Sequence, residues 1–196
     1  IFSNSTGTYF HDLIDNGKKD HVRGSENLET PRYWHIFIGV NNRYADALPL
    51  NGKSASDVNV TLTNFINKYH PTKLTSDNES AFTEKRNLEL LKKNNVQMYI
   101  VTEQNHSSLG IIVRFIRTLR DMNTPKDNKE ERQSHDKKYS TFSPERMAKL
   151  LRIYNNAFHS TIGYSPAEMF NNPELEKEYI FKQLEHSENQ KRISNF

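Results

Sequence analysis

The chain alternates between short apolar runs, bounded by turn-forming residues, and longer segments in which apolar residues recur every three or four positions. The short runs are rich in aromatic and β-branched residues, a composition typical of strands. Asn41 and Asn42 lie between the second and third runs and predict a hairpin turn there, because Asn tolerates left-handed backbone geometry. The five predicted strands span positions 8–15, 33–40, 43–50, 72–76 and 96–101.

The longer segments predict helices. The first begins after a capping serine, Ser54 or Ser56, and ends at His70-Pro71. Further helices are predicted at 83–93, at 108–121, from Ser143 onward and at 172–190. The residues expected on the buried faces of these helices are Val58, Leu62, Phe65, Ile66, Tyr69, Leu88, Leu91, Phe115, Leu119, Met147, Leu150, Leu151, Tyr154, Phe158, Leu175, Tyr179, Ile180 and Leu184.

Two segments lack any apolar periodicity. Positions 16–30 are polar and predict a long loop, and positions 123–142 are densely charged and predict a connector lying in solvent. We therefore expect residues 1–122 to form the main part of one core, and residues 143–196 to form C-terminal helices that complete or extend it. The start at Ile1 suggests a fragment of a longer protein.

The amino-acid composition excludes some classes of protein but does not indicate a function. Basic residues number 27 and acidic residues 24, a balance too even to establish nucleic-acid binding, which would need a local basic face. The absence of cysteine argues against a disulfide framework and against zinc bound by thiolates. No apolar run approaches the length that crosses a membrane, so we expect no membrane partner.

Two aspartates stand out by their position. Asp12 lies within an apolar strand pattern, where an ionised carboxylate is costly unless a metal or a hydrogen-bond donor compensates it. Asp77 directly follows the fourth predicted strand. Each has a plainer interpretation: Asp12 as the one polar position of a surface strand, and Asp77 as a cap for the following turn.

The helix predicted at 108–121 carries a basic face. Val113, Arg117 and Arg120 are separated by four and three positions and therefore share one side of the helix. Arg114 lies beside them in sequence. The plainer interpretation is an amphipathic helix whose charged side faces solvent.

The order of these features resembles the catalytic core of retroviral and retrotransposon integrases, most closely those of gypsy-type and Maverick-type elements. The matching features run over positions 8–170 and end with HSTIGYSPAEMF at 159–170, in which Ser165 caps a short helix and Pro166 starts it. The resemblance implies an α/β, ribonuclease H-like fold. We expect a mixed five-stranded sheet flanked by helices, with an added C-terminal helical segment.

The resemblance also implies metal-dependent DNA strand transfer, with Asp12 and Asp77 binding Mg²⁺ or Mn²⁺ through hard oxygen ligands. In such cores a metal-binding glutamate follows the second aspartate after thirty-five intervening residues. Here positions 78–112 intervene, and Val113 follows. Valine offers neither charge nor lone pair, so we expect catalysis to be severely impaired.

No other acidic residue is expected to replace that glutamate. Glu103 lies ten positions earlier, in the polar loop, and Glu79 lies on the wrong side of Asp77. Asp15 matches a second acidic position of the family's first strand and is not expected to be a ligand. The valine could reflect natural loss or an introduced substitution, and we favour natural loss.

The implied partner is DNA, bound by a homodimer or a larger homo-oligomer in the nucleus, with no small-molecule cofactor. A protein of a different class is the alternative: a non-enzymatic DNA-binding or scaffolding protein derived from an integrase. The expected DNA contacts are Gln104, Asn105, His106, Ser107, Arg114, Arg117 and Arg120.

Overall fold

The computed structural model describes residues 7–16, 30–102, 109–123 and 142–194, with side chains described as far as position 188. Within these residues, five strands form one mixed sheet, as the sequence predicted, and their order is β3-β2-β1-β4-β5. The first three strands pair antiparallel, whereas β4 runs parallel to β1 and β5 parallel to β4. The strands are β1 (Thr8–Asp15), β2 (Tyr33–Gly39), β3 (Ala45–Leu50), β4 (Lys73–Ser76) and β5 (Gln97–Ile100).

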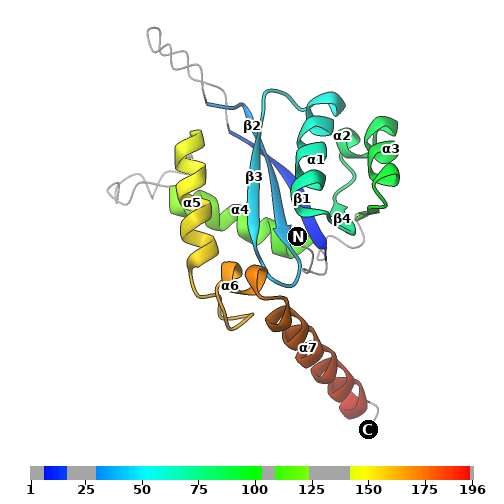
Figure 1. The fold of residues 1–196 in the computed structure, drawn as a ribbon, viewed down its shortest axis with the longest axis vertical. Helices are drawn as coiled ribbons and strands as arrows, with labels where there is room; N and C mark the ends of the chain where they lie inside the picture. The colour runs from blue at the N-terminus through cyan, green and yellow to red at the C-terminus, as the bar shows by residue number, and fades with distance from the viewer. Residues whose placement is uncertain (1–6, 17–29, 103–108, 124–141, 195–196) are drawn as a thin grey trace.

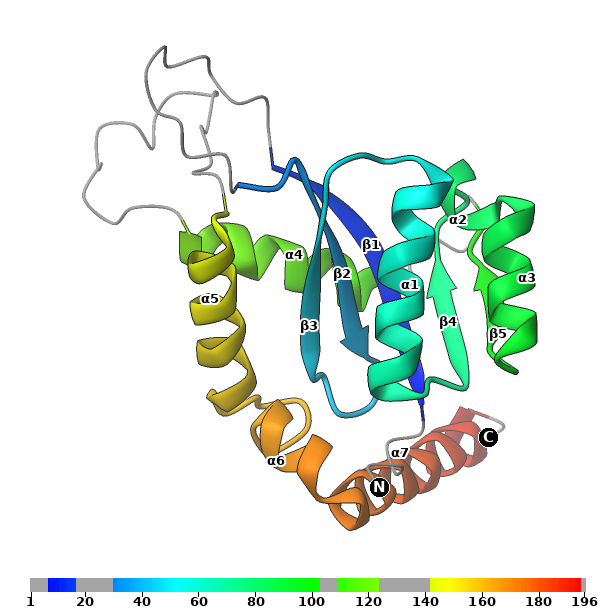
Figure 2. The ribbon, with the colours of Figure 1, turned by 45° about the horizontal axis from the view of Figure 1, so that its top comes forward.

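Helices cover both faces of the sheet (Figures 1 and 2). One face packs against α1 and its neighbours α2 and α3, and the other against α4 and α5. Each face has its own apolar core, and together these cores make the three layers expected of this fold. The helices are α1 (Ala55–Tyr69), α2 (Ser80–Thr83), α3 (Lys85–Lys93), α4 (Gly110–Asn123), α5 (Pro144–Asn156), α6 (Pro166–Asn171) and α7 (Pro173–Ser194).

Strand β1 supplies both cores, because successive side chains of a strand point to opposite faces. Tyr9 lies in the core beneath α1, whereas Phe10 and Ile14 lie in the core beneath α4 and α5. Asp12 has the same parity as Phe10 and Ile14, so its carboxylate is directed to the face that α4 covers. The alternation of this strand therefore fixes the side of the sheet on which an acidic site can form.

The hairpin turn lies where it was predicted, but for a different reason. The positive φ falls on Arg43, at 60°, and not on either asparagine. Asn42 acts through its buried side chain, whose Oδ1 accepts a hydrogen bond from the Tyr44 backbone N–H at 2.9 Å. A Cβ at Gly39 would lie 2.0 Å from that oxygen, so glycine is required to admit the Asn42 side chain.

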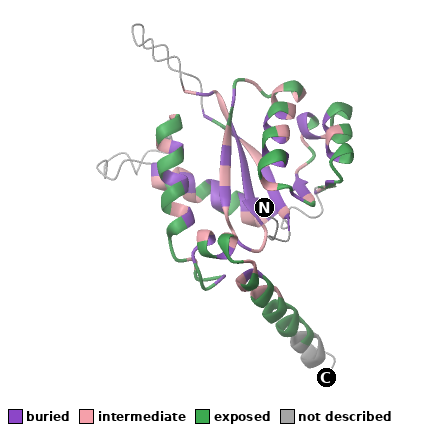
Figure 3. Ribbon diagram, in the orientation of Figure 1, coloured by how far each residue is buried: buried purple, intermediate pink, exposed green. Residues whose placement is uncertain are grey.

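Several residues predicted on buried faces are exposed. In α3 the buried position beside Leu91 is Asn87 and not Leu88, because the Asn87 amide donates to the carbonyls of Ala55 and Ala81. Phe158 follows the end of α5 and is exposed. Leu184 is 59% exposed, because α7 extends away from the sheet and most of its described residues face solvent (Figure 3).

The segment after position 142 packs on the sheet. The Asn155 side chain of α5 accepts from the Ala45 N–H at 3.0 Å and donates to the Ala45 carbonyl at 2.8 Å. Ser165 caps α6 in a capping box with Glu168, and Pro166 starts that helix, as predicted. The division of the chain at 123–142 stays a prediction, because 124–141 lie outside the described residues. None of the helices that the structure describes is both long and apolar enough to cross a membrane.

Two histidines lie buried in the core beneath α1. His11 Nδ1 lies 3.0 Å from His35 Nε2, and His35 Nδ1 lies 2.7 Å from the Thr61 hydroxyl. Burial lowers the pKa of His11 to about 3 and holds the pKa of His35 well below its usual value. Both imidazoles are therefore neutral in the folded protein at neutral pH.

Because both histidines stay neutral in the folded state, we expect the folded protein to lose stability in mild acid. Unfolded histidine titrates near pH 6.5, so below that pH the unfolded chain binds protons that the folded chain excludes. The free energy of unfolding should fall by about 1.4 kcal/mol per pH unit for each histidine as the pH drops from 6.5 toward 4. Urea unfolding at several pH values should show a shallower slope for His11→Phe. The same slope in His11→Phe as in the parent would contradict the conclusion that His11 is neutral in the folded protein. The control is His186→Phe, on the exposed part of α7.

Candidate metal site

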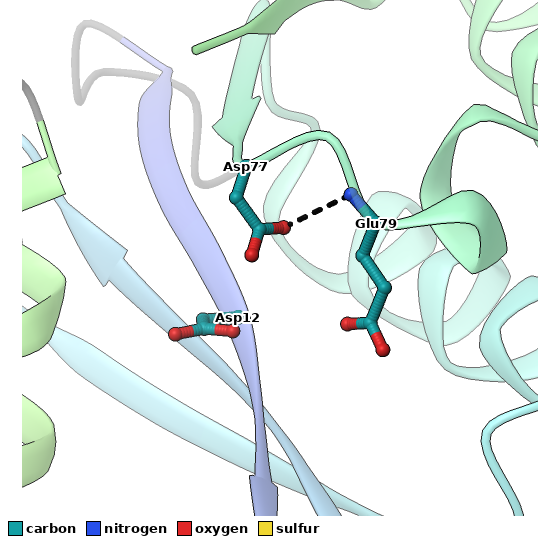
Figure 4. A group of neighbouring side chains, drawn as sticks. All are labelled: Asp12, Asp77 and Glu79. Carbon is teal, nitrogen blue, oxygen red and sulfur yellow. Dashed lines mark hydrogen bonds between the residues drawn. The ribbon is translucent and has the colours of Figure 1, made fainter. Parts of the chain in front are cut away.

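Two aspartates predicted from the sequence lie at the same level of neighbouring parallel strands. The β1–β4 pairing sets Phe10 opposite Thr75. Asp12 lies two residues after Phe10, and Asp77 lies two residues after Thr75. Strand β4 ends at Ser76, so Asp77 stands at its carboxyl end. The two side chains approach one another, each offering a carboxylate oxygen to one cluster of acidic groups (Figure 4).

The third member of that cluster is Glu79. One carboxylate oxygen from each of Asp12, Asp77 and Glu79 lies within 4.8 Å of the others. The prediction that Glu79 lies on the wrong side of Asp77 is therefore wrong. The chain turns immediately after β4, where the Glu79 N–H donates to Asp77 Oδ1 at 3.3 Å, and this turn returns Glu79 to the site. Glu79 follows Asp77 by two positions, but this spacing alone does not show which way the chain turns after the strand.

Burial raises the pKa of Asp12. The negative charges of Asp77 and Glu79 add to this rise. The Leu13 backbone N–H, 2.7 Å from Asp12 Oδ1, and the Lys53 ammonium act in the opposite direction. The resulting pKa is about 6, so the Asp12 carboxylate is poorly compensated by its protein surroundings at neutral pH.

Val113 borders the same hollow as Asp12. It is 57% exposed on α4, and the hollow has a volume of about 480 Å³. The role that the spacing predicts for position 113 stays a prediction. Arg117 and Arg120 border the same hollow, so the predicted helix face is confirmed as a geometric feature. Asp121, which was not predicted as a site residue, also borders the hollow, and its Oδ2 lies 4.0 Å from Arg117 Nε.

The remaining predicted site residues lie elsewhere. Arg114 is exposed on α4. Its positive charge adds to the lowering of the Arg43 pKa, of which burial is the main cause. Asp15 lies at the end of β1 and forms an ion pair with Arg32 at 3.4 Å. Glu103 and the predicted DNA contacts Gln104, Asn105, His106 and Ser107 lie outside the described residues.

The chemistry of these donors suits a divalent cation. Mg²⁺ and Mn²⁺ prefer carboxylate oxygens, and two oxygens bound to one Mg²⁺ at roughly 2.0–2.1 Å lie at most about 4 Å apart. The three carboxylate oxygens lie within 4.8 Å of one another, so a small side-chain movement would bring them onto one cation. A cation would also offset the negative charges of Asp77 and Glu79, which add to the effect of burial on the Asp12 pKa. Asp12, Asp77 and Glu79 are therefore the residues that would hold it.

The fold matches a solved integrase core. The chain is similar to the catalytic core domain of BIV integrase with a TM-score of 0.62 and 17% sequence identity, over 88% of this chain and 99% of that one. No protein-family model matches the sequence, and no curated protein matches it. At this identity the likeness shows the fold alone, the ribonuclease H-like fold of that core, which the order of motifs predicted.

The raised pKa of Asp12 gives a prediction for the metal-free protein. Because its pKa is higher in the folded state than the usual 3.8, the folded protein is destabilised as the pH rises from about 4 through 6. In EDTA at pH 7.5, Asp12→Asn should therefore raise the free energy of unfolding by about 1–3 kcal/mol, with little gain at pH 4. Urea unfolding measures this, with Asp15→Asn as the control. A less stable Asp12→Asn protein at pH 7.5 would contradict it.

Proposed function

We propose that this chain is an integrase-type core that acts on DNA with divalent cations and whose strand-transfer activity is severely impaired. The observation that carries the proposal is the meeting of Asp12, on the central strand β1, with Asp77, at the carboxyl end of β4, while Val113 borders the same hollow as Asp12. The fold supports the general class, since it is that of an integrase core. The nuclear location and the homo-oligomer expected from the sequence belong to the same proposal.

The proposed chemistry is phosphoryl transfer. Divalent cations supply Lewis acidity and offset the negative charge that develops on the phosphate. Asp12 and Asp77 would hold a cation from two adjacent rigid strands, which limits their movement. At Val113 no oxygen donor faces the hollow from that position of α4. The loss of one carboxylate ligand costs on the order of a thousandfold in rate, about 4 kcal/mol.

The basic face of α4 would contact the DNA backbone. Arg117 and Arg120 border the hollow that contains Asp12, so a phosphate bound by them would lie close to the acidic cluster. Arg117 is highly exposed, and its ion pair with Asp121 is long. An exposed pair of this kind contributes little stability, so a phosphate can replace Asp121 at small cost.

Restoring the missing carboxylate tests the catalytic part of the proposal. Val113→Glu should create Mn²⁺-dependent cleavage or joining of branched DNA in a protein that otherwise shows almost none, because it returns an oxygen donor beside Asp12. Gel assays with labelled oligonucleotides measure this. Val60→Glu is the matched control, since Val60 is 60% exposed on α1, on the other face of the sheet. Strong activity in the parent would overturn the proposed impairment.

A non-enzymatic DNA-binding or scaffolding protein is the second candidate. The observation that favours it is the combination of two arginines with an exposed valine around one hollow, since such a surface binds phosphate without needing catalysis. Binding of DNA by both the parent and Val113→Glu, with activity in neither, would favour this candidate over the first.

The arginine pair gives a separate prediction for DNA binding. Arg117→Ala combined with Arg120→Ala should weaken binding and reduce the dependence of log K on log salt by about two counterions, because each arginine neutralises one phosphate. Fluorescence anisotropy across a salt series measures both quantities. Arg86→Ala, on exposed α3, is the control. An unchanged salt slope in the double variant would exclude α4 as the DNA-binding face.

A further inference from the structure

We infer that Glu79 supplies the third carboxylate ligand of a single divalent cation, in place of the glutamate that is missing at Val113, and that Lys53 competes with the cation for Glu79. The inference rests on the proposed function only in taking Asp12 and Asp77 as cation ligands. It adds a ligand from a different element, the turn between β4 and α2.

The backbone holds Glu79 in position without using its side chain. Glu79 is the N-cap residue of α2, and its carbonyl accepts from the Phe82 N–H at 3.0 Å. Its N–H donates to Asp77 Oδ1. N-cap side chains commonly accept hydrogen bonds from the first turn of their helix, but the Glu79 carboxylate makes no such bond. It instead lies with the Asp12 and Asp77 carboxylates.

Glu79 and Val113 lie on different elements around Asp12. Val113, on α4, borders the same hollow as Asp12, whereas Glu79, in the turn that follows β4, belongs to the acidic cluster with Asp12. A carboxylate at Glu79 can therefore complete a set of three ligands around one cation. It leaves the α4 side without an oxygen donor at position 113. The expected outcome is a protein that binds one cation and still lacks efficient strand transfer.

The Lys53 side chain places a positive charge next to Glu79. Its ammonium lies 3.4 Å from Glu79 Oε1, and both side chains are partly exposed. A pair this exposed is weak, so a divalent cation can displace Lys53 from Glu79. The single positive charge of Lys53 also balances only part of the charge of three ionised carboxylates. Attraction for a divalent cation therefore remains.

Mn²⁺ binding tests the inference without any assay of DNA chemistry. Calorimetry or electron paramagnetic resonance of free Mn²⁺ should show one site in the whole chain, with Glu79→Gln weakening it by about tenfold or more, since affinity depends on the number of charged ligands. Lys53→Met should tighten binding several-fold by removing the competitor. Glu89→Gln makes the same change of charge on exposed α3 and should bind Mn²⁺ as the parent does.

The outcomes separate this inference from the proposed function. Loss of binding in Asp77→Asn, with normal binding in Glu79→Gln, would overturn the role of Glu79 and leave the aspartate pair intact. Normal binding in Asp77→Asn, or no Mn²⁺ site in the parent, would overturn both. Should Glu79→Gln fail to fold, as judged by circular dichroism, Lys53→Met decides: unchanged or weaker binding in that variant overturns the inference.

Discussion

The parallel pairing of β1 with β4 is the constraint on which the site depends. Because Phe10 lies opposite Thr75, Asp12 and Asp77 fall at the same level of the sheet although sixty-four residues separate them in sequence. A shift of one residue in that pairing would turn Asp12 toward the opposite face. The two apolar cores prevent such a shift, since it would also bury the wrong side chains of β1 on both faces.

The position of Asp12 serves the candidate metal site but lowers the stability of the metal-free fold. Asp12 lies between Phe10 and Ile14, which pack in the core beneath α4, and its surroundings do not fully compensate its charge. Apolar packing thus holds an electrostatically unfavourable group in place, as is common where a site is organised before its ligand arrives. The acidic cluster is tolerated because it lies at the carboxyl end of β4, where the chain leaves the sheet.

The strands, the mixed sheet and the meeting of Asp12 with Asp77 could be predicted, because strand periodicity and the order of motifs carry that information. The position of Val113 near Asp12 was expected from the thirty-five-residue interval of the family that the chain resembles, and the two residues border one hollow. Glu79 could not be placed, since sequence separation does not show which way the chain turns after a strand. In α3, Asn87 takes the buried place predicted for Leu88, because its side chain donates hydrogen bonds to the backbone carbonyls of Ala55 in α1 and Ala81 in α2, which a simple count of apolar residues does not foresee.

The contact of Asn155 with Ala45 has a consequence for how copies of this chain could assemble. The asparagine amide imitates a neighbouring backbone and occupies the N–H and the carbonyl of one residue on edge strand β3. Farther along that strand, Pro49 has no N–H to offer. A sheet edge blunted in this way resists the addition of another strand. Continuous sheets across two molecules are therefore disfavoured on this side, and association there must rely on the fit between side chains.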